Sequence, residues 1–92
     1  MKINICGIEH KIIECEDKFD ADTHMGMIDY PKAEICINKN MAESIKNATL
    51  CHEVLHGMLM HIGREDLSQD ERFVVSLGNA INQSFIPKAV TE

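Results

Sequence analysis

The chain lacks several features that would place it in a common functional class. No apolar run is long enough to cross a membrane, and charge appears too early in the N-terminal residues for a secretion signal. Lys and Arg number nine against 15 Asp and Glu, a formal net charge of −6. Nucleic acids and anionic membranes bind basic surfaces, so neither is expected as a partner. We expect a cytoplasmic protein.

No pair of cysteines has C-x-x-C spacing, which argues against a zinc ribbon or a redox motif. In the absence of a secretion signal, we expect reduced thiols that serve as small buried side chains. These are Cys6, Cys15, Cys36 and Cys51. No repeat, low-complexity tract or linker divides the 92 residues. The chain is therefore expected to form a single domain, residues 1–92.

Alternating apolar residues predict four short strands in the first part of the chain. The expected strands are Lys2–Ile8, Lys11–Cys15, Met25–Tyr30 and Ala33–Asn38. Turns are expected at Gly7–His10 and at Pro31-Lys32, and a polar loop at Asp17–Thr23. Because the strands are short and follow one another closely, we expect a small antiparallel sheet.

The rest of the chain has helical periodicity. A first helix is expected from a cap at Asn40, with Glu43 three residues on, to Gly63, and a second from about Asp70 to Phe85, before Pro87. Apolar or small residues of the first helix form two neighbouring stripes: Ile45, Ala48, Leu55, Leu59 and Ile62, and Cys51, Val54 and Met58. The predicted fold class is α+β, a sheet packed on two helices.

The first helix contains an HExxH motif, residues 52–56. His52 and His56 are one turn apart, so both imidazoles project from one face and can bind one ion. Zinc is the metal that suits two imidazoles, a carboxylate and an open position for water. Glu53, beside the first ligand, can act as the general base that accepts a proton from that water. The motif predicts a hydrolase with one Zn²⁺ per chain.

The third ligand is less well defined. A metzincin would carry Gly and His where this chain has Leu59 and Ile62, so that class is excluded. The remaining carboxylate candidates follow the first helix: Glu65, Asp66, Asp70 and Glu71. His10 and His24 are upstream alternatives, and His61 is expected to be an exposed helix residue. His24 or Tyr30 is a weaker candidate for stabilising an oxyanion.

Two interpretations of Glu71 compete. Ser68 and Glu71 have the spacing of a capping box, in which Ser68 is the N-cap of the second helix. Alternatively, the loop Arg64–Gln69 can run back the roughly 10 Å that the first helix rises after His56, at 1.5 Å per residue. Glu71 would then lie level with His56 as the third ligand, with Gly78 allowing a close approach of the two helices.

Three stretches together resemble the short phage and prophage proteins grouped with ImmA/IrrE-type metallopeptidases. They are residues 33–38 (AEICIN), 48–57 (ATLCHEVLHG) and 70–81 (DERFVVSLGNAI). The resemblance implies a minimal gluzincin-like fold, a ligand at Glu71 and cleavage of a host or phage protein. Relatives carry Glu at the position of Val75 and Ala at that of Gly78, and this chain departs from them at both.

Two other functions remain open. The chain is short for a peptidase, which favours a zinc-binding phage interaction module that keeps the zincin fold without turnover; in either case strand Ala33–Asn38 is a candidate edge for added peptide. A metal site that uses Cys51 beside His52 is less favourable, because adjacent helical residues diverge by about 100°.

Overall fold

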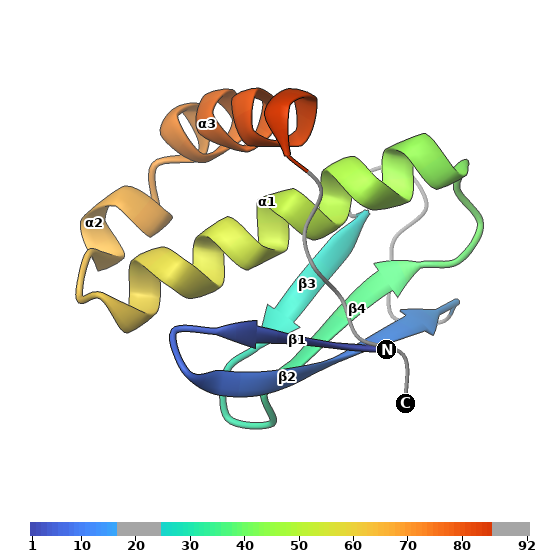
Figure 1. Ribbon diagram of the computed structural model, residues 1–92, viewed down its shortest axis with the longest axis horizontal. Coiled ribbons are helices and arrows are strands. Elements are labelled where there is room, and N and C mark those ends of the chain that lie inside the picture. The colour runs from blue at the N-terminus through green and yellow to red at the C-terminus, as the bar shows by residue number, and fades with distance from the viewer. Residues whose placement is uncertain (17–24, 86–92) are drawn as a thin grey trace.

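The computed structural model describes residues 1–16 and 25–85 and confirms the α+β class (Figure 1). Within these described residues, four strands are followed by three helices. The elements are β1 (Lys2–Ile5), β2 (Ile8–Cys15), β3 (Gly26–Asp29), β4 (Glu34–Asn38), α1 (Glu43–His61), α2 (Glu65–Ser68) and α3 (Glu71–Ser84). The predicted loop at Asp17–Thr23, His24 and Pro87 lie outside the described residues.

The sheet is mixed, so the expectation of an antiparallel sheet was wrong. Its strand order is β1-β2-β4-β3, and β2 pairs with β4 in parallel. The other two pairs, β1 with β2 and β3 with β4, are antiparallel. An alternating pattern specifies which face of a strand is buried but not the direction of its neighbour. Because β4 lies between β2 and β3, the edge strand on this side is β3, and β4 cannot accept an added strand.

The first turn is tighter than expected. It consists of Cys6 and Gly7, both with positive φ (51° and 87°), and the Gly7 N–H donates to Asn4 Oδ1 at 2.8 Å. The left-handed conformation of two successive residues lets β2 begin at Ile8, so residues 8–10 extend the strand instead of forming a turn. His10 consequently lies in β2 opposite Ile3 and is buried, with 1% of its surface exposed.

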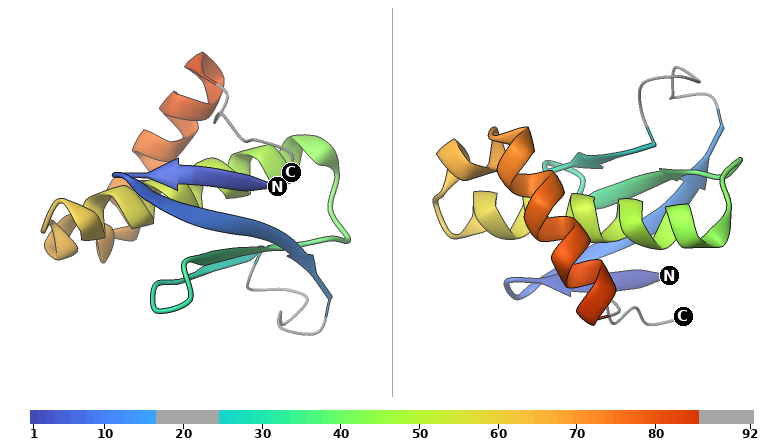
Figure 2. Two further views of the ribbon diagram at one scale, coloured as in Figure 1. Left: turned by 60° about the horizontal axis from the view of Figure 1, so that its bottom comes forward. Right: turned by 90° about the horizontal axis from the view of Figure 1, so that it is seen from above.

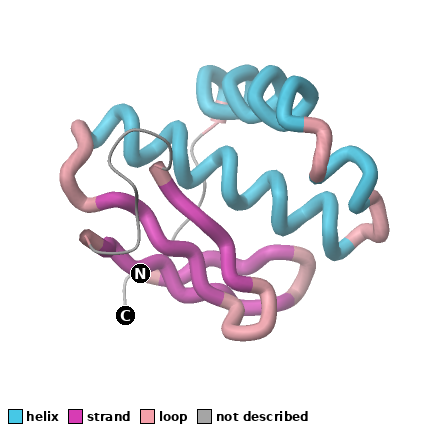
Figure 3. The backbone as a smooth tube through the Cα atoms, turned by 180° about the vertical axis from the view of Figure 1, so that it is seen from behind, coloured by secondary structure: helices cyan, strands magenta, loops and turns pink. Residues whose placement is uncertain are grey.

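The helices all lie on one side of the sheet (Figures 1 and 2). Helix α1 crosses the sheet, and α3 packs on the outer side of α1, which gives the order sheet, α1, α3 (Figure 3). One apolar cluster joins the sheet to α1 and includes Ile5, Ile35 and Val54; the other joins α1 to α3 and includes Leu55 and Val74. Helix α1 is therefore apolar on two sides.

This burial differs in part from the predicted stripes. Ile45, Met58 and Ile62 are 42–63% exposed, while Thr49, Leu50 and Gly57 are buried. The prediction assumed one buried face, whereas α1 packs on the sheet and on α3 through different sets of residues. Two cysteine predictions were also wrong: Cys36 and Cys51 are buried, but Cys6 is exposed and Cys15 is partly exposed. None of the four cysteines forms a disulfide with another described residue.

Helix α1 lies close to the sheet at Gly57. A Cβ atom at this position would lie 3.1 Å from Ile28 Cδ1 and 3.2 Å from Ile5 Cδ1, tighter than most such contacts. A similar restriction applies to Gly26 of β3, where a Cβ would lie 2.7 Å from Thr49 Cγ2. Two glycines thus bring β3 and α1 together next to the HExxH motif.

The helix termini differ from the predicted caps. The N-cap of α1 is Ala42 and makes no side-chain cap hydrogen bond, so the expected cap at Asn40 was wrong. The predicted loop Arg64–Gln69 contains the short helix α2. Asp70, and not Ser68, is the N-cap of α3, and its carboxylate accepts the Phe73 N–H at 3.2 Å. Within residues 1–16 and 25–85, none of the helices has the length and apolar character needed to span a bilayer.

Candidate metal centre

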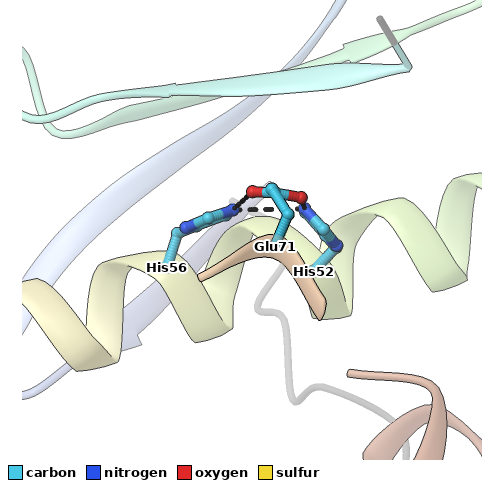
Figure 4. Close-up of side chains that lie close together, drawn as sticks. All are labelled: His52, His56 and Glu71. Carbon is cyan, nitrogen blue, oxygen red and sulfur yellow. Dashed lines mark hydrogen bonds and ion pairs between the residues drawn. The ribbon is translucent and has the colours of Figure 1, made fainter. Parts of the chain in front are cut away.

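His52 and His56 lie in the middle of α1 and point the same way. Their Nε2 atoms are 3.1 Å apart, and their ring planes meet at 69° (Figure 4). Both side chains are partly buried, with exposed fractions of 26% and 15%. Burial lowers the pKa of His52, the charge of Glu71 opposes this, and His56 lowers it further. A lowered pKa favours the neutral imidazole, which is the form that binds a metal ion.

Glu71 brings the third functional group from a different helix. Its Oε1 lies 2.9 Å from His56 Nε2 and its Oε2 lies 3.4 Å from His52 Nε2 (Figure 4). Helix α2 turns the chain back after α1, so that the first residue of α3 lies above the two histidines. His52, His56 and Glu71 each offer one ligand atom, and these atoms lie within 4.8 Å of one another.

The chemistry of this group fits a divalent cation. Ligands about 2.0–2.1 Å from a tetrahedral zinc ion are separated from each other by roughly 3.3 Å, close to the 2.9, 3.1 and 3.4 Å separations here. Two imidazole lone pairs and a carboxylate repel one another unless a positive charge lies between them. A proton can bridge only some of these contacts, whereas a metal ion can satisfy all three.

The other carboxylates considered from the sequence have different partners. Asp66 forms a paired contact with Arg64, at 2.9 and 3.0 Å, which lowers the pKa of its exposed carboxyl. Glu65 accepts a hydrogen bond from Gln69 at 3.1 Å. Asp70 caps α3. None of the three belongs to the ligand cluster in the described part of the chain.

The remaining histidines and the cysteine alternative also lie away from the cluster. His10 donates from Nδ1 to the Ile8 carbonyl at 2.9 Å, and its ring meets that of the exposed His61 edge-on at 5.8 Å. The Cys51 thiol contacts Asn82 Oδ1 of α3 at 3.5 Å, and burial raises its pKa. This geometry therefore does not favour a metal site shared by Cys51 and His52.

Glu53 lies between His52 and His56 in the sequence. Its side chain is buried, with only 7% of the residue's surface exposed. Burial, and to a lesser degree the charge of Glu71, raises the pKa of its carboxyl to about 7. Its carboxyl lines the same cleft as His52, His56 and Glu71. A buried carboxyl with a pKa near neutrality suits a site where a proton is gained and lost.

The cluster opens into a cleft of about 890 Å³. Its walls come from β3, α1 and α3, and His52, Glu53, His56 and Glu71 all line it. Much of the remaining lining is apolar and partly exposed: Met25, Met27, Ile45 and Val75. Tyr30 also lines the cleft; burial raises its pKa, a hydrogen bond with Ser68 lowers it and the charge of Glu53 raises it.

The interpretation of Ser68 as the N-cap of the second helix, one of the two considered, is wrong. Ser68 is buried, and its Oγ lies 3.0 Å from His56 Nδ1, behind the ring as seen from the ligand cluster. The local S-x-x-E pattern predicted a cap, because a capping box and a tertiary contact use the same residue types. The only sequence signal for its true position was its place in a short segment that must pack against the HExxH helix.

Comparison of the chain with protein-family models, with curated proteins and with solved structures found no match.

Proposed function

We propose that this chain is a zinc-dependent hydrolase with a zincin-like site, and that it cleaves peptide bonds. The observation that carries the proposal is the convergence of His52, His56 and Glu71 from two helices on one point, inside a cleft that also exposes Glu53. Two imidazoles and one carboxylate, with the fourth side open to the cleft, form the ligand set of a catalytic rather than a structural zinc site. A bound zinc ion would act as a Lewis acid and lower the pKa of water to about 7.

Glu53 is the proposed general base. Its buried carboxylate accepts a proton from water as the water attacks the scissile carbonyl, and then delivers that proton to the leaving nitrogen. Its pKa of about 7 is suited to both transfers near neutral pH. His52, His56 and Glu71 supply lone pairs and do not transfer the proton.

The substrate is proposed to bind as an extended segment along β3. This strand is the edge of the sheet on the side of the cleft, and residues 25–28 line the cleft. An exposed edge offers backbone N–H and C=O groups to an added strand, and the apolar lining accommodates alternate side chains. The resemblance to ImmA/IrrE-type proteins suggests that the segment belongs to a host or phage protein, met in the cytoplasm.

A second candidate is a zinc-binding interaction module without turnover. The observation in its favour is the exposure of Glu71, whose side chain is 64% accessible although it is a proposed ligand. An exposed ligand leaves less of the site shielded from water than most hydrolases require. Binding of zinc and of a peptide without cleavage would select this alternative.

The test is zinc binding by the purified protein, measured by calorimetry and by metal content. We expect one zinc per chain, and no binding after replacement of both His52 and His56 by Ala. His61→Ala is the matched control, because it removes a histidine from the same helix outside the cluster. Stoichiometric zinc in the double variant would refute the site. Hydrolysis is then tested with casein and a random peptide library.

A further inference from the structure

Ser68 connects a third element to the ligand cluster. It is the last residue of α2, and its side chain is buried against α1. Its Oγ lies 3.0 Å from Nδ1 of His56, while the other ring nitrogen, Nε2, faces Glu71 and His52. The ring of His56 is thus held from both sides, by α2 on one side and by the cluster on the other.

The direction of this hydrogen bond determines which nitrogen of His56 carries the hydrogen. A serine hydroxyl has one hydrogen to donate and two lone pairs. Ser68 Oγ also lies 3.5 Å from the backbone carbonyl of His56, which can only accept, and it forms a hydrogen bond with Tyr30. When the hydroxyl hydrogen points to the carbonyl or to the Tyr30 oxygen, a lone pair of Oγ faces Nδ1, and Nδ1 must be the donor. Nε2 then has no hydrogen, and its lone pair points at the cluster.

We propose that Ser68 is the positioning residue of the metal centre, which holds His56 as the Nδ1–H tautomer with Nε2 free to bind zinc. This inference rests on the proposed function and deepens it. Histidine ligands commonly donate their second N–H to a neighbouring acceptor, which fixes the tautomer and the ring orientation and improves metal affinity. Here the acceptor comes from α2, so the docking of this four-residue helix on α1 is part of the metal site.

The first test needs no mutation. The protein labelled with ¹⁵N-histidine is studied by NMR without metal at pH 8, where imidazoles are mostly neutral. We expect His56 to show the pattern of a hydrogen on Nδ1, whereas free imidazole side chains favour Nε2. A wild-type His56 with its hydrogen on Nε2 would overturn the proposal.

The second test compares Ser68→Ala with Ser68→Thr, which restores the hydroxyl, and with Ser76→Ala, the same change at an exposed serine of α3. Ser68→Ala should shift His56 toward the Nε2–H form and weaken zinc binding about 10- to 100-fold. Ser68→Thr should recover both properties, and Ser76→Ala should change neither. Circular dichroism checks that each variant is folded, so that the comparison is made only between native proteins.

The outcomes separate this inference from the proposed function. Wild-type zinc affinity and an unchanged His56 tautomer in folded Ser68→Ala would refute the role of Ser68 and leave the metal site intact. If the wild type shows the Nδ1–H tautomer, Ser68→Ala loses it, and neither binds zinc, then Ser68 positions His56 but the proposed metal function is wrong.

Discussion

Asp70 and Glu71 are neighbours in sequence with different roles. The Asp70 carboxylate caps the N-terminus of α3 by accepting the Phe73 N–H, while the Glu71 carboxylate lies against the histidines of α1. Because Asp70 already caps α3, Glu71 is not needed as part of a capping box with Ser68. The chemistry of the two carboxylates can be separated by substitution.

Asp70→Ala should lower the free energy of unfolding by about 1 kcal/mol, the usual loss for an N-cap, with zinc affinity changed only slightly. Glu71→Gln should weaken zinc binding and leave the free energy of unfolding nearly unchanged, because an amide replaces an anionic ligand while the helix keeps its cap. Urea denaturation of the metal-free proteins and zinc calorimetry measure the two effects. Equal zinc affinity of Glu71→Gln and wild type would place the third ligand elsewhere.

Glu53→Gln tests the proton transfer. The amide cannot accept the proton, so hydrolysis should fall by about 10²–10⁴-fold, the range of general base catalysis, while zinc stays bound. Cleavage rate and metal content are measured on the same preparation. A variant that loses its metal along with its activity would make Glu53 a ligand or a structural residue instead.

At the scale of residues, the sequence predicted which three side chains converge better than it predicted their surroundings. The spacing of His52 and His56 places both on one helix face, and the return of the chain after α1 brings Glu71 to them. Ser68 could not be predicted, because its partner His56 belongs to another element and the local pattern suggested a cap. Tertiary contacts of short polar side chains leave little trace in a single sequence.

At the scale of elements, α1 is the part of the fold that the sequence described least well. Its position was predicted, but a helix packed on a sheet and on another helix buries two faces, and no single stripe represents it. The parallel pairing of β2 and β4 was missed for a related reason: the burial pattern of Ile35 and Ile37 is the same beside a parallel or an antiparallel neighbour.

Substitution of alanine for Gly78 and for Gly26 should change the stability of the protein in opposite directions. A Cβ at Gly78 would lie 3.7 Å from His52 Cα, an ordinary contact, so glycine is not required there for the approach of α3 to α1, contrary to expectation. Gly78→Ala should stabilise the protein by about 0.5–1 kcal/mol through helix propensity. Gly26→Ala should destabilise it by about 1–3 kcal/mol, because its Cβ meets Thr49 and the Cys36 carbonyl.

Urea denaturation without metal measures both changes. Zinc affinity is the control for Gly78→Ala, which should leave the site unchanged. A destabilised Gly78→Ala protein would mean that α3 lies closer to α1 than this structure places it.

At the scale of the whole molecule, the described residues of this 92-residue chain form two small apolar clusters, and His52, His56 and Glu71 converge where α3 meets α1. A chain of this size buries a modest fraction of its surface, so its intrinsic stability is limited. An ion that joins the two helices in the folded state alone adds its binding free energy to the stability of the fold.

Zinc should therefore raise the melting temperature. At a free concentration 100 times the dissociation constant, the stabilisation is about 2.7 kcal/mol, which corresponds to roughly 10–20 °C for a domain of this size. Differential scanning calorimetry with zinc and with chelator measures the shift. The His52→Ala/His56→Ala protein should melt at one temperature in both conditions; a shift of equal size in that variant would show binding elsewhere.

The parallel pairing of β2 with β4 also has a consequence for the order of folding. The hairpin of β3 and β4 joins residues that are close in sequence, such as Asp29 and Glu34, and needs only a short loop to close. The pairing of Lys11 with Glu34 closes a much longer loop, with a larger loss of chain entropy before any contact forms. The hairpin is thus expected to form early and to dock on β2 later, in the slower step. Helix α1 packs on β1 as well as on β3 and β4, so the HExxH segment has its complete packing surface only after that step.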